Sequence, residues 1–393
     1  MAVLDLHSPV IWISAAVFAI GISVLYQNVG HALNVLGIGK TYTSVNTTSC
    51  HQIGIGVLHG CEDIVVDPNT GLAYLACGSL KPRQHWLHPD DEYDLAHESE
   101  ADHVYIMDEN GKYSDIKLLE TASNGSLQPL SQDFRVHGFD IYWDPHDPQD
   151  MTFIFINHQL VHNAVSIFSY RHGSHHMVHV ETVHSDLLHS PNNVLAMSKR
   201  AFYATNDMKY TRGIMREISI YAQLPHGHVV YRNEDGLFSV AAANIRYPNG
   251  IAKYKTWIYV ASCTDPGVHI YKEDGDGKLS FQGRIVYSDG VPDNLFVDPG
   301  SGQLYSTLFL KSREVHKYFK HPSLNTTRVA ATKIVRLTQR NTGEGFDIES
   351  LLIDSGDLMP TATIAAIQRR NQIRRMLIGC AMCNALVVCS DVA

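Results

Sequence analysis

The 393-residue sequence has no excess of positive charge and no basic stripe with interleaved aromatic residues. Its net charge of −9 argues against a nucleic-acid partner. It also contains no Gly-x-Ser-x-Gly motif, so the serine nucleophile of one large class of esterases is excluded. No segment is of low complexity, and hydrophobic residues make up 45% of the chain. We therefore expect a sizeable folded core rather than disorder.

What the chain does contain is a repeated pair of short strands. In the clearest copy, a β-branched run at 64–66 is followed by turn residues at 67–71 and a second apolar run at 72–76. Copies begin near residues 62, 137, 192, 249, 293 and 361. A strand-pair repeat of about 40 to 50 residues, with insertions, is typical of a β-propeller. We predict an all-β fold, a six-bladed β-propeller over residues 49–393.

Two stretches interrupt this pattern. Residues 80–103 are acidic and contain several histidines, and we expect them to form a surface loop. Residues 212–231 are expected to form another hairpin. Cysteines are few, seven in all, so the chain is no disulfide-dense scaffold. A bridge between Cys50 and Cys389 would tie the two ends of the ring together. Cys380 and Cys383 have the spacing of a redox or zinc pair, which we interpret as coincidence because no second pair accompanies them.

The N-terminal part of the chain differs from the rest. Residues 10–26 (VIWISAAVFAIGISVLY) carry no charge, and their length lies between a secretory signal and a membrane span of roughly 20 residues. We expect residues 1–48 to hold an apolar helix, as a signal-anchor or signal peptide, followed by a linker. Sequons at Asn46, Asn124 and Asn325 predict glycosylation. Together these features predict the secretory pathway, with the propeller on the luminal or extracellular side and possible membrane association through residues 10–26.

Oxygen-bearing side chains recur where the strand pairs begin. The inner strands of a propeller start at one end of the central channel, so these residues are expected to meet there. Mixed carboxylate and amide oxygens suit Ca²⁺, which takes six to eight oxygen ligands, whereas Zn²⁺ prefers Cys and His. Glu62 and Asp63 are neighbours on a strand and point to opposite faces, so they are either ligands of two different sites or a ligand and the residue that supports it. The set is Glu62, Asp63, His137, Asn192, Asn193, Asn249, Asp293 and Asn294.

Several motifs follow one another in a recognisable order: Gly60-Cys61-Glu62-Asp63, His137-Gly138, Ile156-Asn157-His158, Ser190-Pro191-Asn192-Asn193, Phe202 to Asp207, Asn249-Gly250-Ile251 and Asp293-Asn294. Over residues 50–389 the chain resembles the serum paraoxonases, a family of calcium-dependent arylesterases and lactonases. The resemblance implies a six-bladed propeller that holds two Ca²⁺ ions in its channel.

The resemblance also implies roles for individual residues. The catalytic ion would be held by Glu62, Asn192, Asn249, Asp293 and Asn294. The structural ion would be held by Asp63, the backbone carbonyl of Phe139, and Asn193. The family's histidine pair matches His137 and His158, and its disulfide matches Cys50 and Cys389.

Two positions depart from the family pattern. Asn193 stands where the family usually has a carboxylate, so we expect weaker binding of the structural ion, because affinity follows ligand charge. Met208 stands where the animal enzymes have His.

The predicted function is a calcium-dependent hydrolase of lactones and aryl esters, in which Ca²⁺ acts as a Lewis acid and His137, assisted by His158, activates a water. Its partner would be a small-molecule ester or lactone. The alternative is a non-catalytic secreted or membrane-tethered propeller that serves as a binding scaffold, with purely structural Ca²⁺. A propeller enzyme of the strictosidine-synthase type, which works without Ca²⁺, is disfavoured by the presence of Glu62, Asn192 and Asn249.

Overall fold

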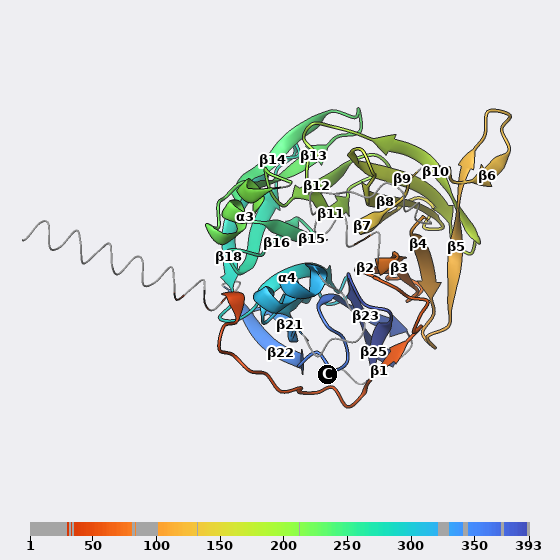
Figure 1. Ribbon diagram of the computed structural model, residues 1–393. Coiled ribbons are helices and arrows are strands. Elements are labelled where there is room, and N and C mark those ends of the chain that lie inside the picture. Colours follow the sequence, from red (N-terminus) through yellow and green to blue (C-terminus); the bar gives the residue numbers. More distant parts are fainter. Residues whose placement is uncertain are drawn as a thin grey trace, which may run out of the picture.

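The repeated strand pairs form the inner halves of six four-stranded blades arranged as a ring (Figure 1). The structure is a computed structural model, which describes residues 30, 33, 35–80, 83, 101–131, 133–211, 213–320, 330–340, 345–370 and 373–390. The predicted apolar helix at 10–26 and the sequon at Asn325 lie outside these residues. Within the described part of the chain, no helix is long and apolar enough to cross a membrane.

Each blade runs from an inner to an outer strand. Blade 1 consists of β2 (Asp63–Val66), β3 (Ala73–Cys77), β4 (His103–Met107) and β5 (Tyr113–Thr121). Blade 2 consists of β7 (Val136–Trp143), β8 (Asp150–His158), β9 (Asn163–Arg171) and β10 (His176–Val183). Blade 3 consists of β11 (Pro191–Ala196), β12 (Phe202–Asn206), β13 (Gly227–Arg232) and β14 (Phe238–Ile245).

The second half of the ring has the same order. Blade 4 consists of β15 (Pro248–Tyr254), β16 (Trp257–Ser262), β17 (Gly267–Glu273) and β18 (Leu279–Val286). Blade 5 consists of β19 (Val291–Val297), β20 (Leu304–Phe309), β21 (Thr332–Gln339) and β22 (Phe346–Asp354). Blade 6 consists of β23 (Ala362–Arg370), β24 (Ile373–Cys380), β25 (Leu386–Ser390) and β1 (Cys50–Ile53).

The ring is closed by the two ends of the chain. Strand β1 is the outer strand of blade 6, where it pairs antiparallel with β25 and places Cys50 opposite Cys389. A disulfide joins these two residues, as predicted, across 339 positions of sequence. In addition, β10 pairs parallel with β5 and so joins the outer edges of blades 1 and 2, and the short β6 (Leu127–Pro129) extends β5 as a hairpin.

Neighbouring inner strands contact one another all the way around the channel, in the order β2, β7, β11, β15, β19, β23 and back to β2. The apolar faces of adjacent blades pack together between them. Tyr74 of blade 1, for example, packs edge-on against Phe153 of blade 2. Burial on both faces explains why the inner strands read as short continuous apolar runs.

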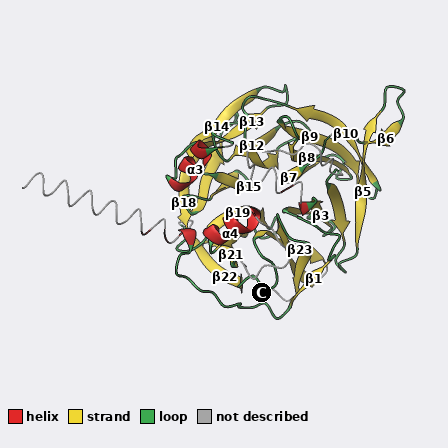
Figure 2. Ribbon diagram, in the orientation of Figure 1, coloured by secondary structure: helices red, strands yellow, loops and turns green. Residues whose placement is uncertain are grey.

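Two helices lie beside the channel opening, α3 (Ile214–Tyr221) and α4 (Ser312–Lys320) (Figure 2). The prediction of a hairpin over 212–231 is therefore wrong in its first half: a helix comes first, and strand β13 begins only at Gly227. Ile214, Met215 and Ile218 are spaced for one face of a helix, and all three are exposed.

Candidate functional site

Backbone irregularities at the starts of the inner strands bring the candidate residues together. The pairing register shifts between Val136 and Phe139, Pro191 and Val194, Pro248 and Ile251, and Pro292 and Leu295. Each shift leaves two residues unpaired, and a bulge of this kind re-aims side chains. The four bulges contain His137, Asn192 with Asn193, Asn249, and Asp293 with Asn294.

All eight predicted oxygen and histidine positions are buried, with exposures between 2% and 8%. Hydrogen bonds link them across blades: the Asn193 side-chain amide donates to Asn294 Oδ1 at 2.8 Å and to Asp63 Oδ2 at 3.2 Å. Asn294 Nδ2 in turn donates to the carbonyl of Glu62 at 3.2 Å. The structure therefore brings together residues that lie more than 200 positions apart in sequence.

The residues form two layers. Glu62, Asn192, Asn249 and Asp293 line a pocket of about 1570 Å³, and we call them the upper cluster. Asp63, Asn193 and Asn294 lie behind them and do not line the pocket; we call them the lower cluster. Asn294, predicted to serve the catalytic ion together with the upper cluster, thus has its amide oxygen hydrogen-bonded within the lower one.

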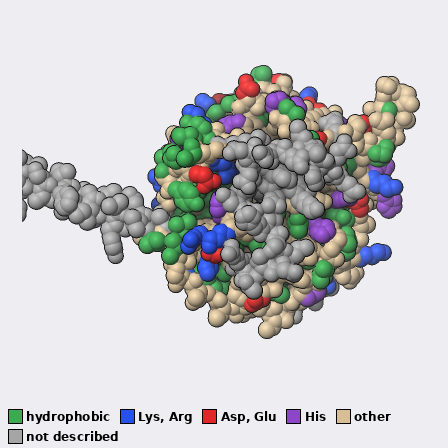
Figure 3. Space-filling view, viewed as in Figure 1, with side chains coloured by type: hydrophobic (Ala, Val, Ile, Leu, Met, Phe, Trp, Pro, Cys, Tyr) green, Lys and Arg blue, Asp and Glu red, His purple; other side chains and the backbone are tan. Residues whose placement is uncertain are grey.

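The pocket opens between α3 and α4, and its wall also includes His137 and His158. On the face shown in Figure 3, Lys and Arg side chains gather near α4. Arg313 and Lys317 of that helix line the pocket. Lys317 is paired with Glu314 at 3.2 Å, whereas Arg313 is exposed.

The upper cluster has one buried oxygen atom that no donor of the described residues satisfies. The Asn249 Oδ1 atom is buried and has no hydrogen-bond partner among the described residues. Burial, together with the negative charges of Glu62 and Asp63, raises the pKa of Asp293 well above its usual range, although a hydrogen bond with Asn249 opposes this. Buried acceptors of this kind are costly unless a cation or donor meets them. The donor set therefore fits an oxygen-preferring cation such as Ca²⁺.

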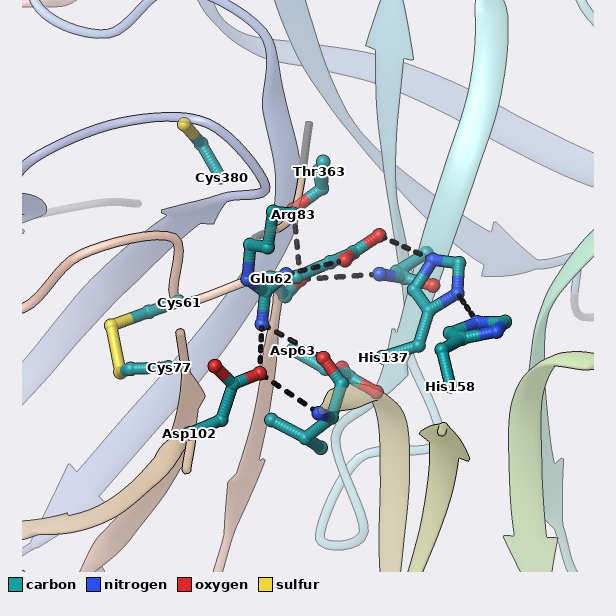
Figure 4. A network of polar contacts seen from close by, with 12 residues as sticks. Cys61, Glu62, Asp63, Cys77, Arg83, Asp102, His137, His158, Thr363 and Cys380 are labelled. Atoms are coloured by element: carbon teal, nitrogen blue, oxygen red, sulfur yellow. Dashed lines mark hydrogen bonds and ion pairs between the residues drawn. A yellow bond between two sulfur atoms is a disulfide. The ribbon is translucent and has the colours of Figure 1, made fainter. Parts of the chain in front are cut away.

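Glu62 has the most contacts in the upper cluster (Figure 4). Its Oε1 lies 2.7 Å from Nε2 of His137, and its Oε2 accepts a hydrogen bond from Arg83 Nη1 at 2.9 Å. Burial acts to raise the pKa of Glu62, but the positive charges of His137 and Arg83 outweigh it, and the pKa lies below its usual range.

Arg83 and Asp102 form the support behind Glu62. The Arg83 side chain is fully buried, donates to the carbonyl of Val136 at 2.8 Å, and lies 3.7 Å from Asp102. Asp102 accepts from the Val136 backbone N–H at 2.9 Å. Both residues belong to the 80–103 stretch that was expected to be a surface loop, and for these two residues that expectation is wrong. A buried salt bridge has no local sequence signal, because it depends on partners from another blade.

The two predicted histidines are in direct contact. His137 Nδ1 lies 2.9 Å from His158 Nε2, with His137 on β7 and His158 at the end of β8. Burial and the nearby charge of His137 lower the pKa of His158 to about 3, so His158 is neutral at physiological pH. Nδ1 of His158 contacts Asn163, a residue that the sequence patterns did not single out.

The lower cluster is hydrogen-bonded throughout. Asp63 Oδ1 accepts from the Ile64 N–H at 2.9 Å, and Oδ2 accepts from the Phe139 N–H at 3.2 Å. Asn193 Oδ1 accepts from the Val194 N–H at 2.6 Å, which fixes its amide so that Nδ2 faces Asp63 and Asn294. Burial raises the pKa of Asp63 to about 7.

Cysteines lie near Arg83 and Asp102, the two residues behind Glu62 (Figure 4). Cys61, next to Glu62 in sequence, is bonded to Cys77 of β3, and Cys380 is bonded to Cys383. The interpretation of the Cys380–Cys383 spacing as coincidence is therefore wrong: the two residues form a disulfide. Cys263 is the free cysteine, and it is buried in the pocket wall.

The described part of the chain holds no group of three or more His, Cys, Asp and Glu side chains arranged to bind a metal ion. The set described above mixes carboxylates with amides from Asn, which is a different composition.

Comparison with known proteins identifies the same family as the motifs. The model of the arylesterase family matches residues 41–390. A chicken (Gallus gallus) serum paraoxonase/arylesterase 2 is 28% identical over 75% of this chain and 78% of its own length. The dog (Canis lupus familiaris) serum paraoxonase/arylesterase 2 is 25% identical over 88% of this chain and 90% of its own length. Among solved structures, a putative gluconolactonase has a TM-score of 0.46 at 14% identity, covering 88% of this chain and 92% of its own.

Proposed function

This chain belongs to the arylesterase family, and from that premise we propose that it is a calcium-dependent hydrolase of lactones and aryl esters. The observation that carries the proposal is the upper cluster: buried carboxylate and amide groups that line a large pocket, with one oxygen atom, Asn249 Oδ1, left without a donor, beside a pair of hydrogen-bonded histidines. Such a site could bind a cation, accept a proton and hold a small organic substrate.

The chain's own residues define where an ion would bind. Glu62, Asn192, Asn249 and Asp293 would provide oxygen ligands from four blades, with Asn294 behind them. When bound, the ion would supply a Lewis acid that polarises a carbonyl oxygen.

His137 is positioned to accept the proton of the attacking water. A water oxygen attacks the ester carbonyl carbon, and its proton passes to Nε2 of His137, where Oε1 of Glu62 lies 2.7 Å away and stabilises the resulting charge. As the carbonyl–oxygen single bond breaks, the leaving oxygen takes that proton. The products are an acid and a phenol, or a single hydroxy acid when the substrate is a lactone.

The second calcium ion, at Asp63, the Phe139 carbonyl and Asn193, stays a prediction. Its site holds fewer unsatisfied atoms than the upper cluster, because the amide of Asn193 already donates to two of the oxygens.

A location in the secretory pathway is also part of the proposal. Three disulfides suit an oxidising compartment. Of the sequons, Asn46 and Asn124 are exposed, as a glycan requires. Asn124 lies in the turn between β5 and β6, the hairpin that projects from the ring (Figure 1).

One observation favours the alternative of a non-catalytic scaffold. Arg83 already places a positive charge on Glu62 at 2.9 Å, so part of the negative charge in the upper cluster is met without an ion. In a scaffold, the ion would only tie blades together and no substrate would turn over.

The deciding experiment measures hydrolysis of phenyl acetate and of a panel of γ- and δ-lactones, with and without a calcium chelator. It uses the full chain and the variants Glu62→Gln and Asp293→Asn. Asp298→Asn is the matched control, because it makes the same change just beyond the far end of β19. We expect hydrolysis that the chelator abolishes, that both cluster variants reduce at least 100-fold, and that the control retains.

Activity that survives the chelator and both variants would remove the calcium mechanism. If the protein is inactive on the whole panel but loses thermal stability when calcium is withdrawn, the scaffold is the correct function.

A further inference from the structure

Asn163 lies directly opposite His158 in the β8–β9 hairpin. The two residues are cross-strand partners at the hairpin end that faces the pocket, and residues 159–162 form the loop between them. This register places Asn163 Oδ1 2.7 Å from Nδ1 of His158. A side chain that contacts Nδ1 of His158 can influence His137 without touching it, because His137 contacts the other ring nitrogen of His158.

The direction of this hydrogen bond is fixed from the far side. Asn163 Nδ2 donates to the carbonyl of His189, in the segment before blade 3, at 2.8 Å. Because the amide nitrogen is committed to a carbonyl oxygen, the atom that faces His158 is Oδ1, which can only accept. The proton of neutral His158 must therefore be on Nδ1.

The consequence passes through His158 to His137. With its proton on Nδ1, His158 presents a lone pair at Nε2, and this lone pair accepts a hydrogen bond from His137 Nδ1 at 2.9 Å. With Nδ1 of His137 committed as a donor, Nε2 is the only nitrogen of His137 that can exchange a proton on the side of the pocket, and in the structure it donates to Oε1 of Glu62 at 2.7 Å. That is the nitrogen which must accept a proton from water in the proposed hydrolysis.

We propose that Asn163 is a positioning residue, which sets the tautomer of His158 and thereby keeps Nδ1 of His137 protonated, so that Nε2 is the nitrogen of His137 that exchanges a proton on the side of the pocket. The proposal rests on the hydrolase function argued above. It adds a third member to the histidine pair, from a position that neither the motifs nor the repeats indicate.

A merely structural role for Asn163 is a weaker explanation, because other bonds already hold this hairpin. The His158 backbone N–H donates to the Arg135 carbonyl at 2.8 Å, and the Leu160 N–H donates to Asp133 Oδ2 at 2.7 Å. Neither of these bonds involves a ring nitrogen. They hold the backbone of the hairpin in place, and they do not determine which ring nitrogen of His158 carries the proton.

The test compares Asn163→Leu, which removes the acceptor, with Asn163→Asp, which keeps an acceptor but loses the donor to His189. The tautomer of His158 is read from long-range ¹H–¹⁵N NMR correlations of histidine-labelled full-length protein, with the signal assigned by His158→Gln. We expect a proton on Nδ1 in the wild type and in Asn163→Asp. In Asn163→Leu we expect the His158 proton on Nε2 of His158. That nitrogen would then donate to Nδ1 of His137, and the proton of neutral His137 would be on Nε2 of His137.

Kinetics provides the second measurement. Asn163→Leu should lower kcat about 10- to 100-fold with KM changed less than about threefold, because proton transfer is impaired and the pocket is intact. Asn163→Asp should recover most of that loss. Asp133→Ala is the matched control: it loosens the same hairpin, and both the tautomer and kcat should stay close to those of the wild type.

The proposal is overturned if Asn163→Leu leaves the His158 proton on Nδ1, or if the tautomer changes and kcat does not. It is also overturned if Asp133→Ala lowers kcat as much as Asn163→Leu does, since loosening the hairpin would then explain both. If the wild type hydrolyses no ester or lactone, the proposed function fails, while the NMR measurement still decides whether Asn163 sets the tautomer.

Discussion

The upper and lower clusters are built from neighbouring residues but differ in how their oxygen atoms are satisfied. Glu62 and Asp63, Asn192 and Asn193, and Asp293 and Asn294 each contribute one residue to each cluster. In the lower cluster, the Asp63 carboxylate receives three N–H donors, from Ile64, Phe139 and Asn193. In the upper cluster, the Asn249 oxygen has no donor in the described part of the chain, whereas burial raises the carboxyl pKa in both clusters, at Asp293 and at Asp63.

This difference shows how a propeller can place two unlike sites one residue apart. The lower cluster is closed off from the pocket and meets its own charge with backbone and amide N–H groups. The upper cluster borders the pocket and leaves the Asn249 oxygen without a donor among the described residues. The proposed cation would therefore satisfy more at the upper cluster, which borders the pocket, than at the lower one.

The largest expected contrast is between one substitution made in each cluster. Asn249→Leu removes an upper-cluster oxygen, and we expect calcium-dependent hydrolysis to fall about 100- to 1000-fold. In chelator, the same variant should lose about 1 to 2 kcal/mol of unfolding free energy, because it removes one amide hydrogen bond, to Asp293, together with an oxygen that had no hydrogen bond. Rates of phenyl acetate hydrolysis and urea unfolding of the chelated protein measure the two effects. Full activity in this variant would contradict the assignment of Asn249 as a ligand.

Asn193→Leu makes the matching change in the lower cluster. It removes the donor shared by Asp63 and Asn294, which leaves two buried oxygens short of a partner. We expect a loss of about 2 to 4 kcal/mol in the unfolding free energy in chelator. Equal losses for Asn193→Leu and Asn249→Leu in urea unfolding would show that the two clusters do not differ.

Asn193→Asp tests the second ion. It restores the carboxylate that the family usually has at this position, and Ca²⁺ affinity follows ligand charge. We expect the second ion to bind at least about tenfold more tightly, as measured by calorimetric titration of chelator-treated protein. An unchanged binding isotherm would mean that the lower cluster takes no ion in either form.

The last expected effect is a pH dependence. The folded-state pKa of Asp63 is raised to about 7, above the unfolded value of 3.8. The protonated form therefore stabilises the fold below pH 4, and that contribution is lost as the pH rises from about 4 through 7. In chelator, Asp63→Asn should flatten this part of the curve of unfolding free energy against pH. Asp140→Asn is the comparison, because Asp140 has a similarly raised pKa outside the clusters; identical slopes for wild type and Asp63→Asn would contradict the prediction.

Much of the fold could be predicted because the strands and turns of a blade depend on residues that are close together in the sequence. The turn after β2 shows this: Asp67 accepts from the Asn69 N–H at 2.8 Å and from the Thr70 hydroxyl at 2.6 Å. The turn after β19 repeats it, with Asp298 accepting from Gly300 and Ser301. Such turns depend only on residues within five positions, so they are visible in sequence. Helix α3 was missed because its apolar spacing was interpreted as a hairpin.

The candidate site could be predicted in part, for the same reason. Glu62, His137, Asn192, Asn249 and Asp293 stand at equivalent points of a repeat, so their meeting follows from the ring. The alternation of side chains along a strand, however, does not hold at the bulges, where consecutive residues both reach the channel. Arg83 and Asp102 have no repeat position at all, and they were predicted to be on the surface.

The resemblance to the family implied the bridge between Cys50 and Cys389 that closes the ring. The sequence by itself determined the number of blades and the group of residues that meets in the channel. These depend on short-range patterns repeated along the chain. Only the tertiary structure decided that Arg83 pairs with Glu62, that Asn163 contacts His158, and that the oxygens divide into a satisfied and an unsatisfied cluster. Hydrogen bonds and ion pairs require positions within a few tenths of an ångström, and those positions result from the packing of whole blades.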